Sequence, residues 1–122
     1  MNTDLYGLPA QTIEEIRNVL ATHPNVEKAV IYGSRAKGNY KPGSDIDLTL
    51  HGQGLSHTEL LTMMSDLDDL LQPYMIDLSL YRMIDHAGLR DHIQRVGREF
   101  YRRQDAKLPE TARPPVPESS DL

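Results

Sequence analysis

Cysteine is absent from this 122-residue chain, and its absence excludes several kinds of chemistry. Disulfide bonds, thiolate-bound metal sites and a cysteine nucleophile all require that residue. A chain without cysteine is compatible with a reducing compartment, so we expect a cytoplasmic protein.

Long apolar runs are also missing. No stretch approaches the ~20 consecutive apolar residues that a helix needs to cross a bilayer. The opening sequence MNTDLYGLPA has neither the basic region nor the apolar core of a signal peptide. Neither a membrane-spanning segment nor a signal peptide is therefore predicted.

Positive charge is in short supply, with 13 Lys and Arg against 18 Asp and Glu, and a formal net charge of -5. Proteins that hold long DNA or RNA through its phosphates are normally basic. Long nucleic acid is therefore not the expected ligand. A single nucleotide remains compatible with this charge, because metal ions can neutralise its phosphates locally.

The pattern that is present predicts one domain over residues 1–104, in which helices cover a small mixed β-sheet. The fold class is α/β or α+β, because the elements follow the order helix–strand–strand–helix–strand–helix. Ser56 and Glu59 form a capping-box signature before the second helix. Helices are expected at residues 8–23, 56–72 and 89–96, with Pro73 and Gly97 ending the second and third.

Short β-branched and apolar runs predict the strands, at residues 28–33, 45–51 and 75–81. Residues 34–43 are polar and basic and are expected to form a loop with room for one helical turn. Phe100 and Tyr101 are expected to be a short packed segment. Residues 105–122 are rich in Pro, Ser and charge, and we predict a disordered tail there.

Three aspartates share one face of the predicted strands. Side chains alternate along a strand, so Asp45 and Asp47 project to the same side, with Cα atoms roughly 6.5–7 Å apart. Asp77 lies on one face of the third predicted strand, whose other face is apolar. If the two strands are neighbours, the three carboxylates meet, and Mg²⁺ is the ion that such oxygen ligands favour. Two carboxylates of this kind can bridge metal ions about 3.5–4 Å apart.

A Gly-Ser pair follows the first predicted strand directly. Gly33 allows the backbone to approach a phosphate closely, and Ser34 adds a hydroxyl. Arg35, Lys37 and Lys41 could add positive charge, and Arg35 is best placed for a bidentate phosphate contact. Each feature alone has an ordinary explanation as a turn, a solvated strand or a basic loop. Their combination in so short a chain points to a nucleotide site.

The stretch from Gly33 to Gly38 (GSRAKG), followed by Ser44-Asp45-Ile46-Asp47-Leu48, resembles the signature of the polymerase-β-type nucleotidyltransferase superfamily. The chain is most similar to its minimal nucleotidyltransferases, the MNT antitoxins encoded beside HEPN-domain toxins. The resemblance covers roughly residues 13–101 and implies a nucleotidyltransferase fold. It also implies site roles: Gly33, Ser34, Arg35 and Ser44 bind ATP, while Asp45, Asp47 and Asp77 bind two Mg²⁺ ions and form the catalytic centre.

The function that the resemblance implies is transfer of AMP from ATP to a hydroxyl, expected to be a tyrosine, of a partner HEPN toxin. Two alternatives stay open: adenylylation of a small molecule such as an aminoglycoside, and a non-catalytic antitoxin that acts by binding alone. None of the five histidines shows ligand spacing, and none is expected to be catalytic.

Overall fold

The computed structural model describes residues 5–71 and 74–104. Pro73 and the predicted tail over residues 105–122 lie outside the described residues, as do the first four residues. In chain order the elements are α1 (Ala10–Ala21), β1 (Lys28–Tyr32), α2 (Gly33–Lys37), β2 (Ile46–His51), α3 (His57–Leu71), β3 (Ile76–Leu80), the short 3₁₀ helix η1 (Tyr81–Met83), α4 (Ala87–Val96) and β4 (Arg98–Arg102).

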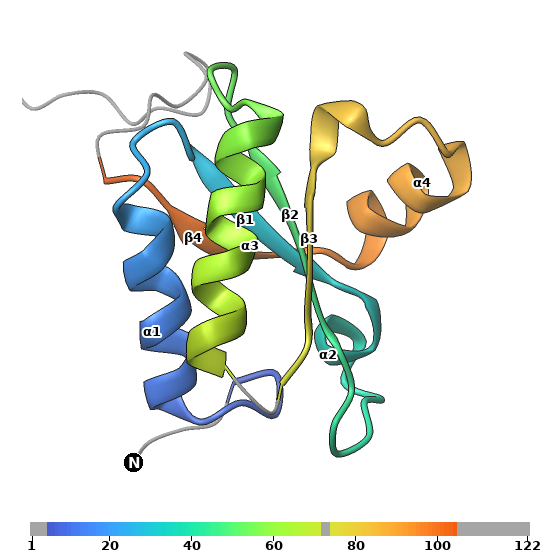
Figure 1. Ribbon diagram of the computed structural model, residues 1–122. Helices are drawn as coiled ribbons and strands as arrows, with labels where there is room; N and C mark the ends of the chain where they lie inside the picture. Colours follow the sequence, from blue (N-terminus) through green and yellow to red (C-terminus); the bar gives the residue numbers. More distant parts are fainter. Residues whose placement is uncertain (1–4, 72–73, 105–122) are drawn as a thin grey trace, which may run out of the picture.

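The four strands form one mixed sheet in the order β3-β2-β1-β4 (Figure 1). β1 is antiparallel to both β2 and β4, whereas β2 and β3 are parallel. A parallel pair needs a crossover connection, and α3 supplies it between β2 and β3. The predicted fold class, a small mixed sheet flanked by helices, is confirmed.

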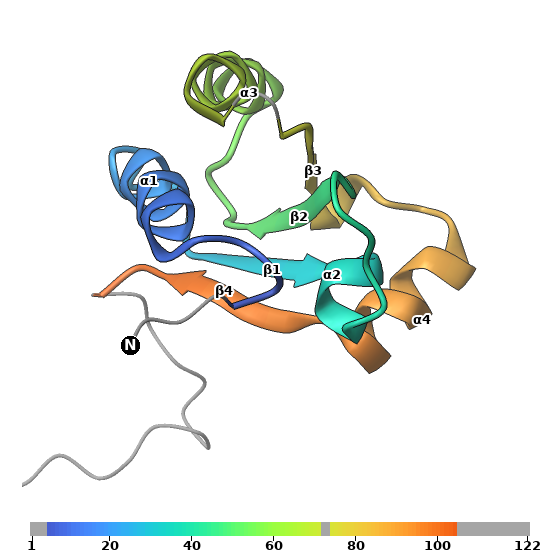
Figure 2. The same ribbon diagram turned by 90° about the horizontal axis from the view of Figure 1, so that it is seen from below.

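The hydrophobic core lies between one face of the sheet and the pair α1 and α3, which Figure 2 shows together on one side of the sheet. Alternate strand residues point into this core, and burying one such aliphatic side chain contributes roughly 1.5–3 kcal/mol. Sheet and helices contribute Ala29, Ile31, Ile46, Leu48, Leu50, Ile76, Leu78, Leu80, Ile13, Ile16, Leu20, Leu60, Met63 and Leu67. The same alternation turns the polar residues of the strands to the opposite face.

The fourth strand differs from the sequence expectation, which gave Phe100 and Tyr101 only a short packed segment. β4 pairs with β1 along the outer edge of the sheet, with a register irregularity beside Ala29 and Val30. In β4 only Phe100 is fully buried, because one side of an edge strand faces solvent. Because four of its five residues, REFYR, are charged or only partly buried, β4 lacks the alternation of apolar and polar residues that predicts a strand.

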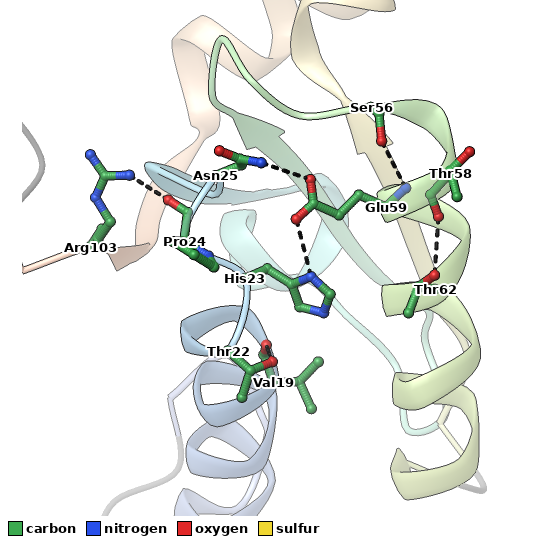
Figure 3. A network of polar contacts seen from close by, with 10 residues as sticks. All are labelled: Val19, Thr22, His23, Pro24, Asn25, Ser56, Thr58, Glu59, Thr62 and Arg103. Atoms are coloured by element: carbon green, nitrogen blue, oxygen red, sulfur yellow. Dashed lines mark hydrogen bonds and ion pairs between the residues drawn. The ribbon is translucent and has the colours of Figure 1, made fainter.

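The start of α3 follows the predicted capping signature in part (Figure 3). The Ser56 hydroxyl accepts the Glu59 N–H at 3.1 Å, as an N-cap does. The Glu59 carboxylate is engaged by the segment after α1, at 3.3 Å from His23 Nδ1 and 3.2 Å from Asn25 Nδ2. This cluster of contacts ties the start of α3 to the end of α1. Among the described residues, no helix is long and apolar enough to cross a membrane.

Candidate active site

The parallel pairing of β2 and β3 places two of the predicted aspartates side by side. Asp47 and Asp77 are direct partners in the register, on strands that lie about 4.8 Å apart. Asp47 is partly buried, and Asp77 is exposed at the outer strand. The condition on which the sequence prediction depended, that these two strands are neighbours, is therefore met.

Asp45 lies one residue before β2 and is exposed to solvent. It is close enough to act on Asp47 electrostatically. Within residues 5–71 and 74–104, however, no three Asp, Glu, His or Cys side chains are grouped closely enough to enclose a metal ion. The structure thus brings Asp47 and Asp77 together, and a metal site shared by all three aspartates stays a prediction.

The pKa of the Asp47 carboxyl is shifted by burial and by its position beside the other two aspartates. Its pKa is raised from 3.8 to about 6, first by burial and then by the charges of Asp77 and Asp45, with Arg35 opposing. A carboxylate whose neighbours are also negative lacks a compensating charge. The donor set, three hard oxygen ligands with excess negative charge, is chemically suited to a divalent cation such as Mg²⁺.

Tyr32, the last residue of β1, completes this polar surface of the sheet. It is the antiparallel register partner of Asp47. Burial raises the pKa of its hydroxyl, a hydrogen bond with Ser79 lowers it, and the charges of Asp77 and Asp47 raise it further. The Tyr32 hydroxyl therefore stays neutral beside the carboxylates.

Gly33 brings the main chain against the carboxylate of Asp47. Its φ is +77°, in the left-handed region that glycine adopts readily. A Cβ at this position would overlap Asp47 Oδ2, so only glycine fits without displacing the carboxylate. The turn between β1 and α2 is thereby fixed next to the acidic pair. Ser34 follows as a partly buried residue of α2, and its carbonyl accepts the Gly38 N–H at 2.9 Å.

Arg35, predicted to contact phosphate, is held by contacts within the protein, and its role as a phosphate ligand stays a prediction. Its side chain is buried, with 3% of the residue exposed. Nε and Nη2 donate to the Ser44 carbonyl at 3.1 and 2.9 Å, and Nη1 donates to the Tyr6 carbonyl at 2.8 Å. The guanidinium also lies 5.3 and 5.6 Å from the ring centroids of Tyr40 and Tyr74. These contacts assign Arg35 to the support of the loop that leads to Asp45.

Ser44 is engaged in the same loop. Its hydroxyl accepts the Lys41 N–H at 2.8 Å, and its own N–H donates to the Lys41 carbonyl at 2.9 Å. The residue predicted as a nucleotide ligand therefore shapes the turn before β2. Lys37 and Lys41 are exposed, which leaves their charges free to act on a ligand from solution.

His92 is a residue of this site that sequence reasoning missed. It projects from α4, and its Nε2 accepts the Gly33 N–H at 3.2 Å. Its ring meets that of Tyr32 edge-on, with centroids 6.2 Å apart and planes at 80°. Figure 2 shows why: α2 and α4 lie next to each other where β1 ends and β4 begins. A position on a predicted helix gives no sign of that tertiary contact.

A mixed sheet that carries paired carboxylates beside a Gly-Ser turn is the arrangement expected of the nucleotidyltransferase fold. The family model "Polymerase beta, Nucleotidyltransferase" matches residues 14–106, and the chain belongs to this family. No curated protein matches the sequence significantly.

Solved structures with the same fold include toxin-antitoxin structures. A crystal structure of a toxin-antitoxin with AMP-PNP has 20% sequence identity and a TM-score of 0.63, over 75% of this chain and 74% of the other. The structure of a tri-AMPylated Shewanella oneidensis HEPN toxin in complex with MNT antitoxin has 18% sequence identity and a TM-score of 0.59, over 77% of this chain and 72% of the other. The toxin-antitoxin MntA-HepT has 18% sequence identity and a TM-score of 0.59, over 77% of this chain and 73% of the other. At these identities the likeness shows the fold.

Proposed function

We propose that this chain is a Mg²⁺-dependent adenylyltransferase that transfers AMP from ATP to a tyrosine hydroxyl of a partner HEPN-domain toxin and thereby acts as its antitoxin. The observation that carries the proposal is the register pairing of Asp47 with Asp77 beside the Gly33 turn. The partner class is taken from the toxin-antitoxin complexes that share the fold.

The reaction assigns a task to each group. The acceptor hydroxyl oxygen forms a bond to the α-phosphorus of ATP, the bond from that phosphorus to the bridging oxygen breaks, and pyrophosphate leaves. Asp77, exposed on the outer strand, accepts the hydroxyl proton. Gly33 and Ser34 hold the triphosphate through main-chain N–H groups and the serine hydroxyl.

Asp45, Asp47 and Asp77 would hold the metal. When bound, Mg²⁺ supplies charge neutralisation for the triphosphate and acidifies the attacking hydroxyl. Because Asp45 and Asp77 are exposed, the carboxylates are open to an acceptor carried on the surface of another protein. Positioning and charge, rather than covalent chemistry by the chain, account for catalysis in this scheme.

The decisive experiment uses ATP labelled at the α-phosphate, Mg²⁺ and the protein encoded by the neighbouring gene. We expect label on that protein, and none when the label is at the γ-phosphate. Asp45→Asn and Asp47→Asn should abolish labelling. Asp68→Asn, which changes an exposed aspartate of α3 outside the site, is the matched control and should label normally.

The alternatives give different results in the same assay. Absence of label, together with unchanged neutralisation of the toxin by Asp45→Asn and Asp47→Asn, would contradict the enzymatic proposal and favour a binding-only antitoxin. Label on an aminoglycoside, with none on the protein, would favour small-molecule adenylylation.

A further inference from the structure

His92 is bonded to the main-chain group that the proposed function assigns to the nucleotide. The Gly33 N–H donates to His92 Nε2 at 3.2 Å, and both groups are partly buried. A nitrogen that accepts this bond carries no proton, so the ring proton of neutral His92 is on Nδ1. The amide has one hydrogen and can make one strong bond. A phosphate oxygen and His92 therefore compete for it.

The ring can leave without unfolding its helix, because α4 is anchored by other residues. Ile93 is 4% exposed and packs inward. Gln94 Nε2 donates to the Tyr81 hydroxyl at 3.0 Å, and the Arg90 guanidinium lies 4.3 Å from the centroid of the Tyr81 ring. Rotation about the side-chain bonds of His92 is thus sufficient to release the Gly33 amide.

We propose that His92 is a positioning residue of the nucleotide site, which holds the Gly33 amide in the nucleotide-free protein and is displaced by a triphosphate oxygen. The inference rests on the proposed function, because it takes the Gly33 turn as the triphosphate site. A charged phosphate oxygen is a stronger acceptor than a neutral imidazole nitrogen, so the exchange favours the nucleotide. Because the bond between the Gly33 amide and His92 must break first, the nucleotide binds less tightly than it would without that bond.

Nucleotide affinity tests this competition directly. The probe is Mg²⁺–AMP-PNP, titrated calorimetrically into the full chain. His92→Leu fills similar space but cannot accept the amide, so we expect it to bind AMP-PNP about threefold to tenfold more tightly, the size of one net hydrogen bond. His92→Gln can accept the N–H again and should return to the wild-type affinity. His57→Leu, at an exposed histidine of α3, is the matched control and should change nothing.

A second measurement uses the unaltered protein, so it does not depend on the folding of a variant. Long-range ¹H–¹⁵N spectra should show an unprotonated Nε2 for His92 in the free protein. Addition of AMP-PNP should shift the His92 ring and the Gly33 amide together. A histidine that only packs against Tyr32 would show no such linked change.

The outcomes separate the two proposals. If the wild-type chain binds AMP-PNP but His92→Leu binds with equal or lower affinity, His92 does not compete with the nucleotide and this inference is overturned, while the adenylyltransferase proposal stands. A protonated Nε2 in the free protein would overturn it in the same way. If the wild-type chain binds no AMP-PNP with Mg²⁺, the proposed function fails and the inference fails with it.

Discussion

At Gly33 the main chain passes directly against the carboxylate of Asp47, and the two glycines at the ends of α2 allow the effect of that contact to be isolated. Gly33 and Gly38, the residue that ends α2, both have positive φ values, +77° and +90°. A Cβ at Gly33 would meet Asp47, whereas a Cβ at Gly38 would meet no atom within 4 Å. An alanine at either position would have a strained backbone, but only an alanine at Gly33 would also overlap the Asp47 carboxylate.

We therefore predict that Gly38→Ala costs about 1 kcal/mol in the free energy of unfolding, from the left-handed conformation alone. Gly33→Ala should cost about 1–3 kcal/mol more, because the carboxylate must also move, and it should abolish AMP-PNP binding. Denaturant unfolding and calorimetric titration measure both effects. Equal losses in the two variants would contradict the predicted collision.

Asp47 gives a prediction about pH. Its folded-state pKa of about 6 lies above the ordinary value of 3.8, first because of burial and then because of Asp77 and Asp45. A raised carboxyl pKa stabilises the folded state below pH 3.8, and that stabilisation is lost as the pH rises through 6. In the metal-free protein at pH 8, Asp47→Asn should therefore be more stable than the wild type.

The expected gain for Asp47→Asn is on the order of 1 kcal/mol, after allowance for the solvent around a partly buried group, and corresponds to a melting temperature about 4–8 °C higher. Thermal unfolding at pH 8 and pH 4 measures it. The difference should shrink at pH 4, where the wild-type carboxyl is mostly protonated in the folded state. A gain of the same size at both pH values would argue against charge repulsion as its cause.

Among the elements, α2 depends on one buried cation. Arg35 bonds to the carbonyls of Ser44 and Tyr6 and so joins α2, the turn before β2 and the N-terminal turn. We predict that Arg35→Lys lowers the free energy of unfolding by about 2–4 kcal/mol without any nucleotide present, since lysine keeps the charge but loses the planar fork.

Arg17→Lys is the control for Arg35→Lys: it replaces another arginine with a main-chain bond, to the Phe100 carbonyl at 2.9 Å, in a less buried place. Arg17→Lys should lower the free energy of unfolding by less than Arg35→Lys does. Denaturant unfolding of both variants without ligand is the measurement. If Arg35→Lys unfolded like the wild type but bound AMP-PNP weakly, the result would contradict the structural role and support Arg35 as a phosphate ligand.

The elements also show what sequence reasoning could supply. Apolar alternation predicts β2 and β3, and with them the shared face of Asp47 and Asp77, because a two-residue period is a local property. The burial of Arg35 depends on carbonyls from two distant segments, and the place of His92 depends on how α4 packs beside α2. Both depend on tertiary contacts. The sequence around a buried arginine or a packed histidine looks the same as that of a basic loop or a surface histidine.

For the molecule as a whole, His51 at the end of β2 is a second group, after Asp47, that makes the free energy of unfolding depend on pH. Its ring stacks on Tyr81 with centroids 4.7 Å apart. Its pKa is lowered from 6.5, first by burial and then by the charge of Lys28, which outweighs the opposing Glu27. A lowered histidine pKa means that the unfolded chain takes up the proton more readily, so stability is lost as the pH falls below 6.5.

We predict that His51→Phe, which keeps a stacked ring and removes the titrating group, loses less stability than the wild type between pH 7.5 and pH 5. Thermal unfolding at both pH values is the measurement, and His57→Phe at an exposed position is the control. Asp47 acts with the opposite sign in part of the same range, so each variant is compared with the wild type at the same pH. A pH dependence of His51→Phe equal to that of the wild type would rule out the His51 contribution.

The strand order β3-β2-β1-β4 has a consequence for how the site forms in time. β1 and β2 are consecutive strands of the chain, and their antiparallel pairing brings Gly33, directly after β1, against Asp47 at the same end of the pair. Asp77 joins them across 30 positions, and His92 reaches Gly33 across 59. Closing a longer loop costs more entropy, so the local hairpin is favoured to form before the distant contacts. The hairpin that sets Gly33 against Asp47 is therefore expected to form first, and the bond from the Gly33 amide to His92 is among the last contacts of the site to be made.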